Sequence, residues 1–136
     1  MTIRLLIADD HEWVREGLRY AFANTGIEIV AEASTGKSAA SLALEVEVDV
    51  VLLDIKMPDG DGMDALSRIK AAKGNLPVLI YSAHDRPDYV QRCASLGASG
   101  YLRKGVDNQV LVAAVRDAFA GQEVWDGVAT TLNDER

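Results

Sequence analysis

The sequence predicts an α/β fold in which a parallel, doubly wound β-sheet carries helices on both faces. Five short runs rich in leucine and β-branched residues alternate with longer stretches of helical spacing, which is typical of parallel strands joined by crossover helices. Right-handed crossovers and an odd number of strands favour an open sheet. With 136 residues and no internal repeat, the chain is expected to form one domain around one core.

The five expected strands include three that are almost wholly apolar, as strands buried on both faces of a sheet usually are. An open sheet of this kind binds ligands beyond the carboxyl ends of its strands, so the residues after these ends are the first candidates for a functional site. The strands are predicted at Ile3–Ala8, Glu28–Ala33, Asp49–Leu53, Val78–Ser82 and Gly100–Leu102.

The first two helices are predicted from the spacing of apolar residues. Between His11 and Asn24, four apolar side chains share one helix face, and Gly26 after them suits a helix stop. A second, weakly amphipathic helix is expected between Ser38 and Val46. The apolar face of the first helix consists of Val14, Leu18, Ala21 and Phe22.

Three further helices complete the alternation. The third is expected from Asp59 to Lys73, closed by Gly74 and by Pro77, because proline cannot continue a helix interior. The fifth is expected to run to Phe119 from a cap at Asp107. The fourth is predicted from the i, i+3, i+4 and i+7 spacing of Val90, Cys93, Ala94 and Gly97.

The charge balance and the cysteine content limit the possible partners and compartments. The chain has 21 acidic and 14 basic residues and a net charge of −7, so it lacks the positive surface that nucleic acid or an anionic membrane requires. A lone cysteine, Cys93, cannot form an internal disulfide and fits a reducing compartment. Without a secretion signal or an apolar run of membrane-spanning length, the chain is expected to be soluble and cytoplasmic.

Polar residues stand at the carboxyl ends of four expected strands: Asp9 and Asp10, Asp54, Ser82 and Lys104. Two carboxylates about 4 Å apart repel each other by about 4 kcal/mol at an effective dielectric of about 20, so something must offset the repulsion. Mg²⁺ would do so, since it prefers oxygen ligands, while Lys104 adds a positive charge and Ser82 a hydroxyl donor. Together these residue types predict a site for a phosphoryl group.

Each of these residues also has an ordinary structural interpretation when it is taken alone. Asp10 or Asp54 could cap a helix, Ser82 could be a turn residue, and Lys104 could be a solvated surface charge. Five such residues at the ends of four strands are much less easily explained in this way. Their combination therefore favours the phosphoryl site.

Several motifs extend the pattern beyond single residues. They are Leu6–His11 (LIADDH), Val14–Leu18 (VREGL), Asp54–Gly62 (DIKMPDGDG), Tyr81–Ala83 (YSA) and Gly97–Lys104 (GASGYLRK). Through them, the chain from Ile3 to about Ala120 closely resembles the receiver domain of two-component response regulators, in particular the NarL/FixJ (LuxR-type) regulators. The resemblance implies a five-stranded, flavodoxin- and CheY-like sheet of order 2-1-3-4-5 with five helices. It also implies a receiver domain at 1–120, followed at 121–136 by the start of an interdomain linker or a C-terminal tail.

The resemblance implies that Asp54 is the phosphoacceptor for a sensor histidine kinase. Mg²⁺, or Mn²⁺, would be held by Asp54, by Asp10 directly, by Asp9 largely through water, and by the backbone carbonyl of Lys56. Phosphoryl transfer of this kind depends mainly on positioning and charge neutralisation, which fits a carboxylate nucleophile facing a metal ion.

The resemblance further implies a switch around the phosphoryl group. Lys104 would pair with Asp54 or its phosphate, Ser82 and the backbone of Ala83 would bind the phosphate, and the ring of Tyr101 would turn inward. Tyr101 could instead be an ordinary edge-strand aromatic. The expected readout surface consists of the fourth helix, the fifth strand and the fifth helix.

Three positions depart from the family pattern or vary within it. Gly105 follows Lys104 where the family often has proline, so the loop is expected to be looser while the role of the lysine stays intact. Lys56 and His84 occupy the positions that modulate phosphoryl lifetime, and we expect both to affect dephosphorylation. The alternative for His84 is a solvated loop residue.

The implied protein is a signalling switch rather than an enzyme, with only self-phosphorylation and self-dephosphorylation chemistry. Its partners would be the sensor kinase and a second copy, through the first and fifth helices or through the readout surface. Trp13, Val110 and Leu111 are candidates for the first of these contacts, although Trp13 could be a partly buried surface residue. DNA would be bound only by a helix-turn-helix domain in a longer parent protein.

Two other function classes are less well supported. A stand-alone Mg²⁺-dependent phosphohydrolase of the haloacid dehalogenase type has a second Asp two residues after its nucleophile, and Lys56 occupies that position. A flavin or nucleotide carrier would need a glycine-rich phosphate loop after the first strand, where this chain has two acids.

Overall fold

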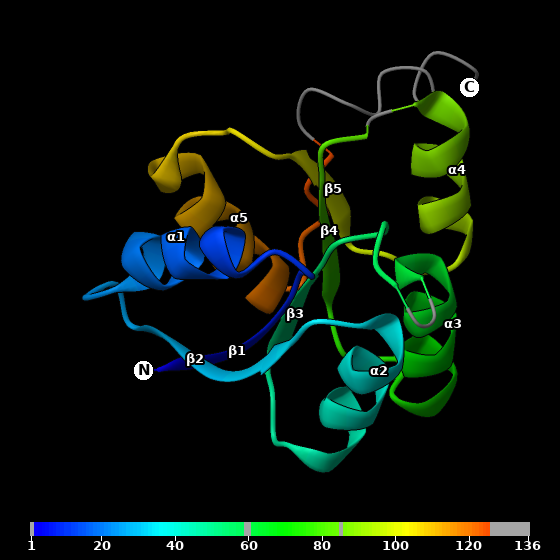
Figure 1. The fold of residues 1–136 in the computed structure, drawn as a ribbon, viewed down its shortest axis with the longest axis horizontal. Helices are drawn as coiled ribbons and strands as arrows, with labels where there is room; N and C mark the ends of the chain where they lie inside the picture. The colour runs from blue at the N-terminus through cyan, green and yellow to red at the C-terminus, as the bar shows by residue number, and fades with distance from the viewer. Residues whose placement is uncertain (1, 59–60, 85, 126–136) are drawn as a thin grey trace.

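Five parallel strands form one sheet in the order β2-β1-β3-β4-β5 in the computed structural model, which describes residues 2–58, 61–84 and 86–125 (Figure 1). This confirms the doubly wound α/β sheet and its strand order. Three of the predicted strand boundaries shift by one residue, at Ile27, Val50 and Arg103. The strands are β1 (Ile3–Ala8), β2 (Ile27–Ala33), β3 (Val50–Leu53), β4 (Val78–Ser82) and β5 (Gly100–Arg103).

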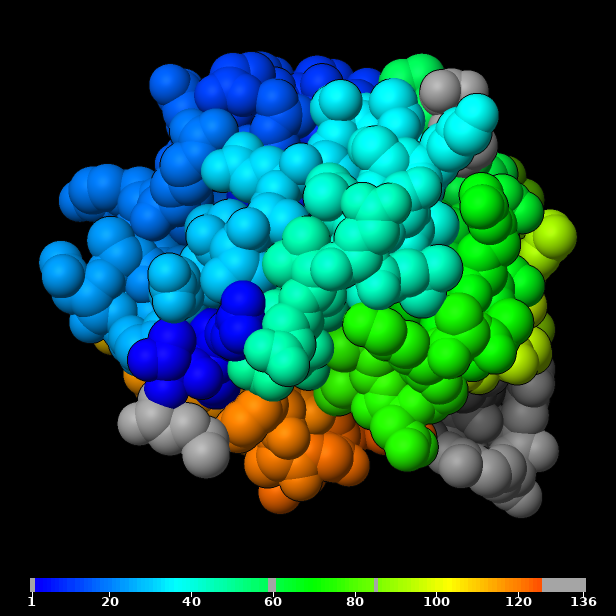
Figure 2. Space-filling view, turned by 90° about the horizontal axis from the view of Figure 1, so that it is seen from below, coloured from blue at the N-terminus to red at the C-terminus, as the bar shows by residue number. Residues whose placement is uncertain are grey.

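The helices cover both faces of the sheet. α1 (Glu12–Phe22) and α5 (Asn108–Phe119) pack on one face. The other face carries α2 (Gly36–Glu45), α3 (Gly62–Ala72) and α4 (Pro87–Ser95), and Figure 2 shows α2 and α3 side by side at the surface. Among the described residues, no helix combines the length and the hydrophobicity needed to cross a membrane.

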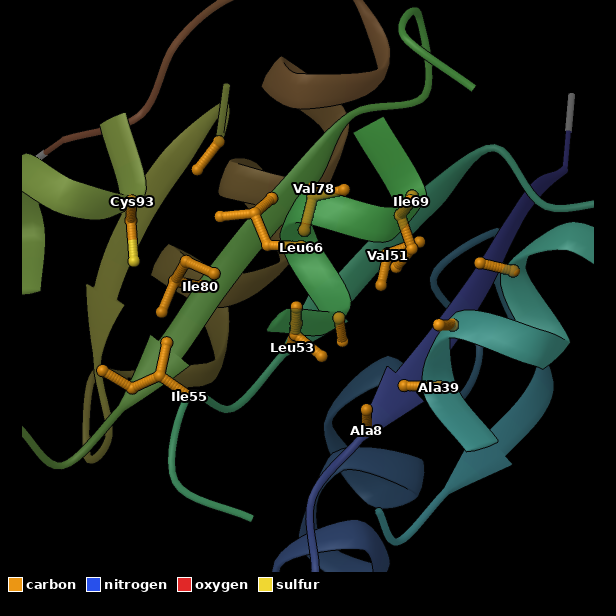
Figure 3. Packing of buried hydrophobic residues seen from close by; sticks show 14 of the residues in the cluster. Ala8, Ala39, Val51, Leu53, Ile55, Leu66, Ile69, Val78, Ile80 and Cys93 are labelled. Carbon is orange, nitrogen blue, oxygen red and sulfur yellow. The ribbon is translucent and has the colours of Figure 1, made fainter. Parts of the chain in front are cut away.

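The core consists of two apolar layers, one on each face of the sheet. Figure 3 shows the layer under α2, α3 and α4, in which Ala39 lies over Ala8 and Leu66 lies beside Val78. Cys93 of α4 is fully buried in the same layer, as expected from its place on the apolar face of this helix. All four residues of β3 are buried, and each such aliphatic side chain contributes about 1.5–3 kcal/mol.

Two helices begin at capping residues that the apolar spacing does not reveal. α2 starts at Gly36, two residues before the expected Ser38, because Thr35 and Ser38 form a reciprocal capping box. α3 starts at Gly62 and is capped by Asp61, whose side chain accepts a hydrogen bond of 2.9 Å from the backbone N–H of Asp64. The expected first residue of that helix, Asp59, lies outside the described residues.

The end of α1 also differs from the prediction. The helix stops at Phe22 rather than near Asn24, and Gly26 is not its stop. Asn24 turns the chain with a φ of +62°, which asparagine tolerates better than most residues. The Thr25 hydroxyl donates to the carbonyl of Phe22 at 2.5 Å and satisfies one of the free carbonyls at the helix end.

The predictions for α4 and α5 need smaller corrections. Gly97 is not part of the α4 face, because the helix ends at Ser95 and Gly97 follows it with a φ of +99°, a conformation that favours glycine after a helix. Asp107 stands at the cap position of α5, but its side chain makes no capping hydrogen bond.

The segment after α5 returns to the edge of the sheet. The Val124 N–H donates to the carbonyl of Ser99 at 2.8 Å, and the Tyr101 N–H donates to the carbonyl of Val124 at 2.9 Å, which forms a parallel bridge beside Gly100. A Cβ atom on Gly100 would lie 2.1 Å from the Val124 oxygen. Trp125 packs against the core layer under α4. The outer edge of β5 is therefore paired with the chain's own segment.

Candidate functional site

The sheet brings the polar strand ends together at one rim. β1 and β3 end in register, so Asp9 and Asp54 follow neighbouring strands at the same level, and the Asp54 N–H donates to the carbonyl of Ala8 at 3.0 Å. β4 and β5 end beside them, where the Lys104 N–H donates to the carbonyl of Ser82 at 2.9 Å. The backbone hydrogen bonds of the sheet therefore position four side chains at this rim independently of any contact between them. These are Asp9, Asp54, Ser82 and Lys104.

Lys104 bridges the two buried carboxylates of this rim. Its Nζ lies 2.5 Å from Asp9 Oδ2 and 3.1 Å from Asp54 Oδ2. Asp9 is 1% exposed and Asp54 is 4% exposed, so both charges are largely removed from water. The other oxygen of Asp54, Oδ1, accepts a longer hydrogen bond of 3.3 Å from the backbone N–H of Lys56.

The pKa values at this rim respond to burial and to charge. Burial raises the pKa of Asp54, against the opposing effects of Lys104 and of the Lys56 N–H. Burial alone would lower the pKa of Lys104, but the hydrogen bond and charge of Asp9 and Asp54 together raise it. Lys104 therefore stays a cation at neutral pH. Its positive charge offsets the cost of burying Asp9 and Asp54 in their ionised form.

Asp10 and His11 extend the acidic cluster toward solvent. Asp9 Oδ1 accepts a hydrogen bond of 2.9 Å from the His11 N–H, and His11 Nδ1 lies 3.2 Å from Asp10 Oδ1. Asp10 Oδ1 is buried and receives no hydrogen bond from the described residues, whereas the buried Asp9 Oδ2 is paired with Lys104 Nζ. A buried acceptor without a donor costs about 1–3 kcal/mol, so Asp10 Oδ1 is suited to bind a cation.

The donor set fits a hard divalent cation. Three carboxylates lie at the rim, and ligand atoms of Asp9, Asp10 and His11 lie within 4.8 Å of one another. Mg²⁺ is held in proteins by one or two carboxylates, with water and phosphate oxygens completing its shell. Asp9, Asp10 and Asp54 could hold such an ion, together with the backbone carbonyl of Lys56, a residue whose N–H already contacts Asp54.

The opposite side of the rim is formed by the segment after β4. The fully buried hydroxyl of Ser82 accepts a hydrogen bond of 3.0 Å from the His84 N–H, so in this state Ser82 stabilises a turn. Tyr101 is also fully buried, and its hydroxyl donates to the carbonyl of His84. The ring of Tyr101 therefore points inward. Ala83, between these residues, is exposed, as is His84.

Two of the ordinary structural interpretations are wrong. The cap of α3 is Asp61 and the residue at the cap position of α1 is His11, so neither Asp54 nor Asp10 caps a helix. The side chain of Lys104 is only 18% exposed and paired with two carboxylates, so it is not a solvated surface charge.

Two residues that support the rim carried no assigned role in the sequence analysis. Gly62 lies so close to the acceptor loop that a Cβ atom would stand 2.0 Å from the carbonyl oxygen of Asp54. Arg15 donates to the backbone carbonyl of Asp9 and pairs with Glu12 and Glu32. The Glu12–Arg15 pair has the i, i+3 spacing of a helical ion pair, which is the sequence signal that could have identified it.

A sequence model of the family described as "Response regulator receiver domain" matches residues 5–116. Response regulator GacA of Pseudomonas aeruginosa is 34% identical over 121 residues, which cover 88% of this chain and 56% of the relative. The chain thus spans about half the length of the curated relatives it matches.

Solved structures of similar proteins share the whole fold. A LuxR-family two-component response regulator from Aurantimonas sp. SI85-9A1 superposes with a TM-score of 0.91 and 31% identity, over 100% of this chain and 99% of that one. CheY of Borrelia burgdorferi, in a complex with CheX, BeF3 and Mg²⁺, superposes with a TM-score of 0.81 and 29% identity, over 86% of this chain and 89% of that one.

Proposed function

Because the chain belongs to the family of response regulator receiver domains, in its NarL/FixJ branch, we propose that it takes a phosphoryl group from a sensor histidine kinase onto Asp54. The observation that carries this proposal is the bridge of Lys104 between buried Asp9 and buried Asp54. A cation held against a carboxylate at a strand end is suited to neutralise a phosphoryl group attached to that carboxylate.

The proposed step is a direct displacement at phosphorus. A carboxylate oxygen of Asp54 forms a bond to the phosphorus atom, and the bond between phosphorus and the imidazole nitrogen of the kinase histidine breaks. The bonding electrons stay on that nitrogen. Lys104, 3.1 Å from Asp54 Oδ2, would compensate the charge of the acyl phosphate, so little acid or base chemistry is needed.

Mg²⁺ or Mn²⁺ is the proposed cofactor, since bound at the acidic rim it would neutralise charge on the transferring phosphoryl group. The support is the buried oxygen Asp10 Oδ1, which receives no hydrogen bond from the described residues, beside the carboxylates of Asp9 and Asp54. Asp10 is half-exposed and Asp9 is buried, which agrees with a direct ligand at Asp10 and a water-mediated one at Asp9. Asp54 and the carbonyl of Lys56 would complete the protein ligands.

The proposed switch lies on the other side of the acceptor. Ser82 would give up its turn hydrogen bond with His84 and donate its hydroxyl to the phosphate, beside the N–H of Ala83. Tyr101 is already buried and bonded to the carbonyl of His84, so the movement of Ser82 would be transmitted to β5, α4 and α5. Lys56 and His84, both exposed at this rim, are proposed to modulate the lifetime of the phosphoryl group.

The test is phosphorylation by a small donor. The chain is incubated with acetyl phosphate and Mg²⁺ and weighed by mass spectrometry, beside Asp54→Ala and a control that removes an exposed acid of α5, Asp117→Ala. We expect one labile phosphoryl group in wild type and in Asp117→Ala and none in Asp54→Ala. The absence of an adduct in wild type, with steady turnover of phosphate esters, would support the phosphohydrolase alternative instead.

The proposed lifetime effect has its own test. The aspartyl phosphate is formed, the donor is removed, and the decay is followed in Lys56→Ala and in His84→Ala. We expect the dephosphorylation rate to change in each variant, because a cation and an imidazole beside the acceptor affect the approach of water. An unchanged decay rate in both variants would contradict this proposal and support the alternative that His84 is a solvated loop residue.

Dimerisation is proposed through α1 and α5. Trp13 is 71% exposed and Tyr20 is 81% exposed on α1, whereas the alternative surface of α4, β5 and α5 has its strand edge paired with Val124. Leu111 was expected in this contact but is 2% exposed and belongs to the core, so only Val110 remains from α5. Sedimentation of wild type and Trp13→Ala with beryllofluoride tests this proposal.

The remaining proposals concern the whole regulator. The sequence predicts the receiver domain at 1–120 and a linker or tail at 121–136, but Val124 pairs with β5 and Trp125 packs against the core, so the proposed domain extends to Trp125. Residues 126–136, which lie outside the described part, are proposed to lead toward a helix-turn-helix domain that binds DNA. The receiver domain itself is proposed to contact no nucleic acid or membrane. The proposed location is the cytoplasm, which is in keeping with a single cysteine, Cys93, that has no disulfide partner in this chain. Binding of the full-length parent to its promoter with and without phosphorylation tests the output.

A further inference from the structure

The ring of Tyr89 gathers basic side chains from two loops beside the acceptor. Tyr89 lies in the first turn of α4. The ammonium nitrogen of Lys56 stands 4.9 Å from its ring centroid, and the guanidinium carbon of Arg86 stands 5.0 Å from it. The His84 ring meets it edge-on at 6.3 Å. One half-buried aromatic ring therefore connects α4 with the loop that carries the acceptor.

The two cations on this ring, Arg86 and Lys56, differ in their carboxylate partners. Arg86 forms a two-pronged ion pair with Asp88, at 3.1 Å and 3.0 Å. For Lys56, no carboxylate lies within ion-pair distance among the residues that the structure describes. The Tyr89 ring is thus the principal described partner of the Lys56 ammonium, beside a cavity of about 270 Å³ that both residues line.

The Lys56 side chain starts next to a site that attracts it. Its own backbone N–H is bonded to Asp54 Oδ1. Among the described residues, Lys104 is the one lysine paired with the cluster of Asp9, Asp10 and Asp54, through Asp9 and Asp54. An ion pair of this ammonium with the half-exposed Asp10 would be similar in strength to an exposed cation–π contact. The ring and the carboxylate cluster therefore compete for the same ammonium group on nearly equal terms.

We propose that Tyr89 is a positioning residue for Lys56, which holds the lysine ammonium against α4 and keeps it out of the Asp9–Asp10–Asp54 carboxylate cluster. Without the ring, the ammonium would enter the cluster and compete with a divalent cation for the same oxygens. Tyr89 would then increase the Mg²⁺ affinity and the rate of phosphorylation without contacting the cation or the phosphoryl group. This inference rests on the proposed phosphoacceptor site and adds a residue to it.

The decisive experiment is a double-mutant cycle on Mg²⁺ binding. Amide NMR shifts of Asp9, Asp10 and His11 are followed during titration with MgCl2, which requires no phosphorylation. We expect Tyr89→Leu to weaken Mg²⁺ affinity by about two- to fivefold, the range that loss of one exposed cation–π contact allows. Tyr89→Phe retains an aromatic ring and should bind as wild type does. Tyr20→Leu, which removes an exposed tyrosine of α1, is the matched control.

The dependence on Lys56 separates positioning from a structural effect. In the Lys56→Met background, which keeps the backbone carbonyl, Tyr89→Leu should no longer change the Mg²⁺ affinity. An unchanged affinity in Tyr89→Leu, or a loss that persists with Lys56→Met, would overturn the inference. If Tyr89→Leu does not fold, the Lys56 Hε resonances of wild type decide: an upfield ring-current shift supports the contact, and random-coil values refute it.

Phosphorylation gives a second readout. With acetyl phosphate, Tyr89→Leu should be slower at low Mg²⁺ and approach the wild-type rate at saturating Mg²⁺, whereas distortion of the acceptor would slow both. Equal slowing at all Mg²⁺ concentrations would contradict the inference. A wild-type chain that binds Mg²⁺ but forms no adduct would instead disprove the proposed function and leave the binding cycle interpretable.

Discussion

The hydroxyl of Tyr101 donates a hydrogen bond to the backbone carbonyl of His84. The ring of Tyr101 is fully buried, so this bond ties the middle of β5 to the loop that follows Ser82. The loop in turn is held by the hydrogen bond from the His84 N–H to the Ser82 hydroxyl. The acceptor side of the site and the α4–β5 side of the domain are thus connected by two consecutive hydrogen bonds.

Tyr101→Phe should lower the free energy of unfolding by about 1 kcal/mol, because it removes one hydrogen bond and leaves the ring in place. Tyr101→Ala should cost about 3–5 kcal/mol, since it leaves a cavity in the core. Urea denaturation of the three proteins measures both. A Tyr101→Phe variant as unstable as Tyr101→Ala would mean that the ring is not held by packing.

Lys104→Met should be strongly destabilising, by about 3–5 kcal/mol, because Asp9 and Asp54 lose the cation that compensates them in a buried site. Adding Asp54→Asn should recover part of this loss, since one of the two facing charges is then gone. Urea midpoints in Mg²⁺-free buffer complete the cycle. Strictly additive losses would show that Lys104 and Asp54 do not interact.

Gly100→Ala should detach the segment around Val124, because the new Cβ would stand 2.1 Å from the Val124 oxygen and 2.9 Å from Leu79 Cδ2. We expect a stability loss of about 1–3 kcal/mol from the steric conflict. In a Trp13→Phe background, the fluorescence of Trp125 should shift to the red as it enters water. Gly105→Ala is a poor control because of its φ of +99°, so Gly17→Ala, with open space around it, serves instead.

Cys93 should be unreactive in the folded protein. It is fully buried, and burial raises the pKa of its thiol to about 12. The unfolded chain ionises this group above about pH 8.5, so the folded state binds more protons and its stability should fall as the pH rises above that value. The Cys93→Ala variant should show a smaller fall between pH 8 and pH 11 in urea titrations. Rapid labelling of native wild type by a thiol reagent would contradict the assignment.

The strand ends could be predicted from sequence because apolar runs of this kind stop where the polar residues begin. The position of Asp9 beside Asp54 then follows from parallel register alone. The helix ends could not be predicted equally well, because the end of α1 depends on the positive φ of Asn24 and the start of α2 on the hydrogen bonds of the Thr35–Ser38 capping box. The apolar spacing records neither.

Long-range contacts outside the strand-end residues and the family motifs could not be predicted. Tyr89 and Lys56 meet only because α4 packs beside the loop after β3, and neither residue carries a motif that indicates the other. The same holds for Val124, whose backbone pairs with β5 although the sequence around it reads as the start of a linker.

The pairing of Val124 with β5 also decides how the domain can be exchanged between proteins. A graft cut at the end of α5 would leave the N–H of Tyr101 and the carbonyl of Ser99 without their partners and uncover the core layer that Trp125 contacts. Such an exposed strand edge is a template for pairing with other chains. Chimeric regulators built on this receiver should therefore carry residues 121–125 with it and join the foreign output sequence only after Trp125.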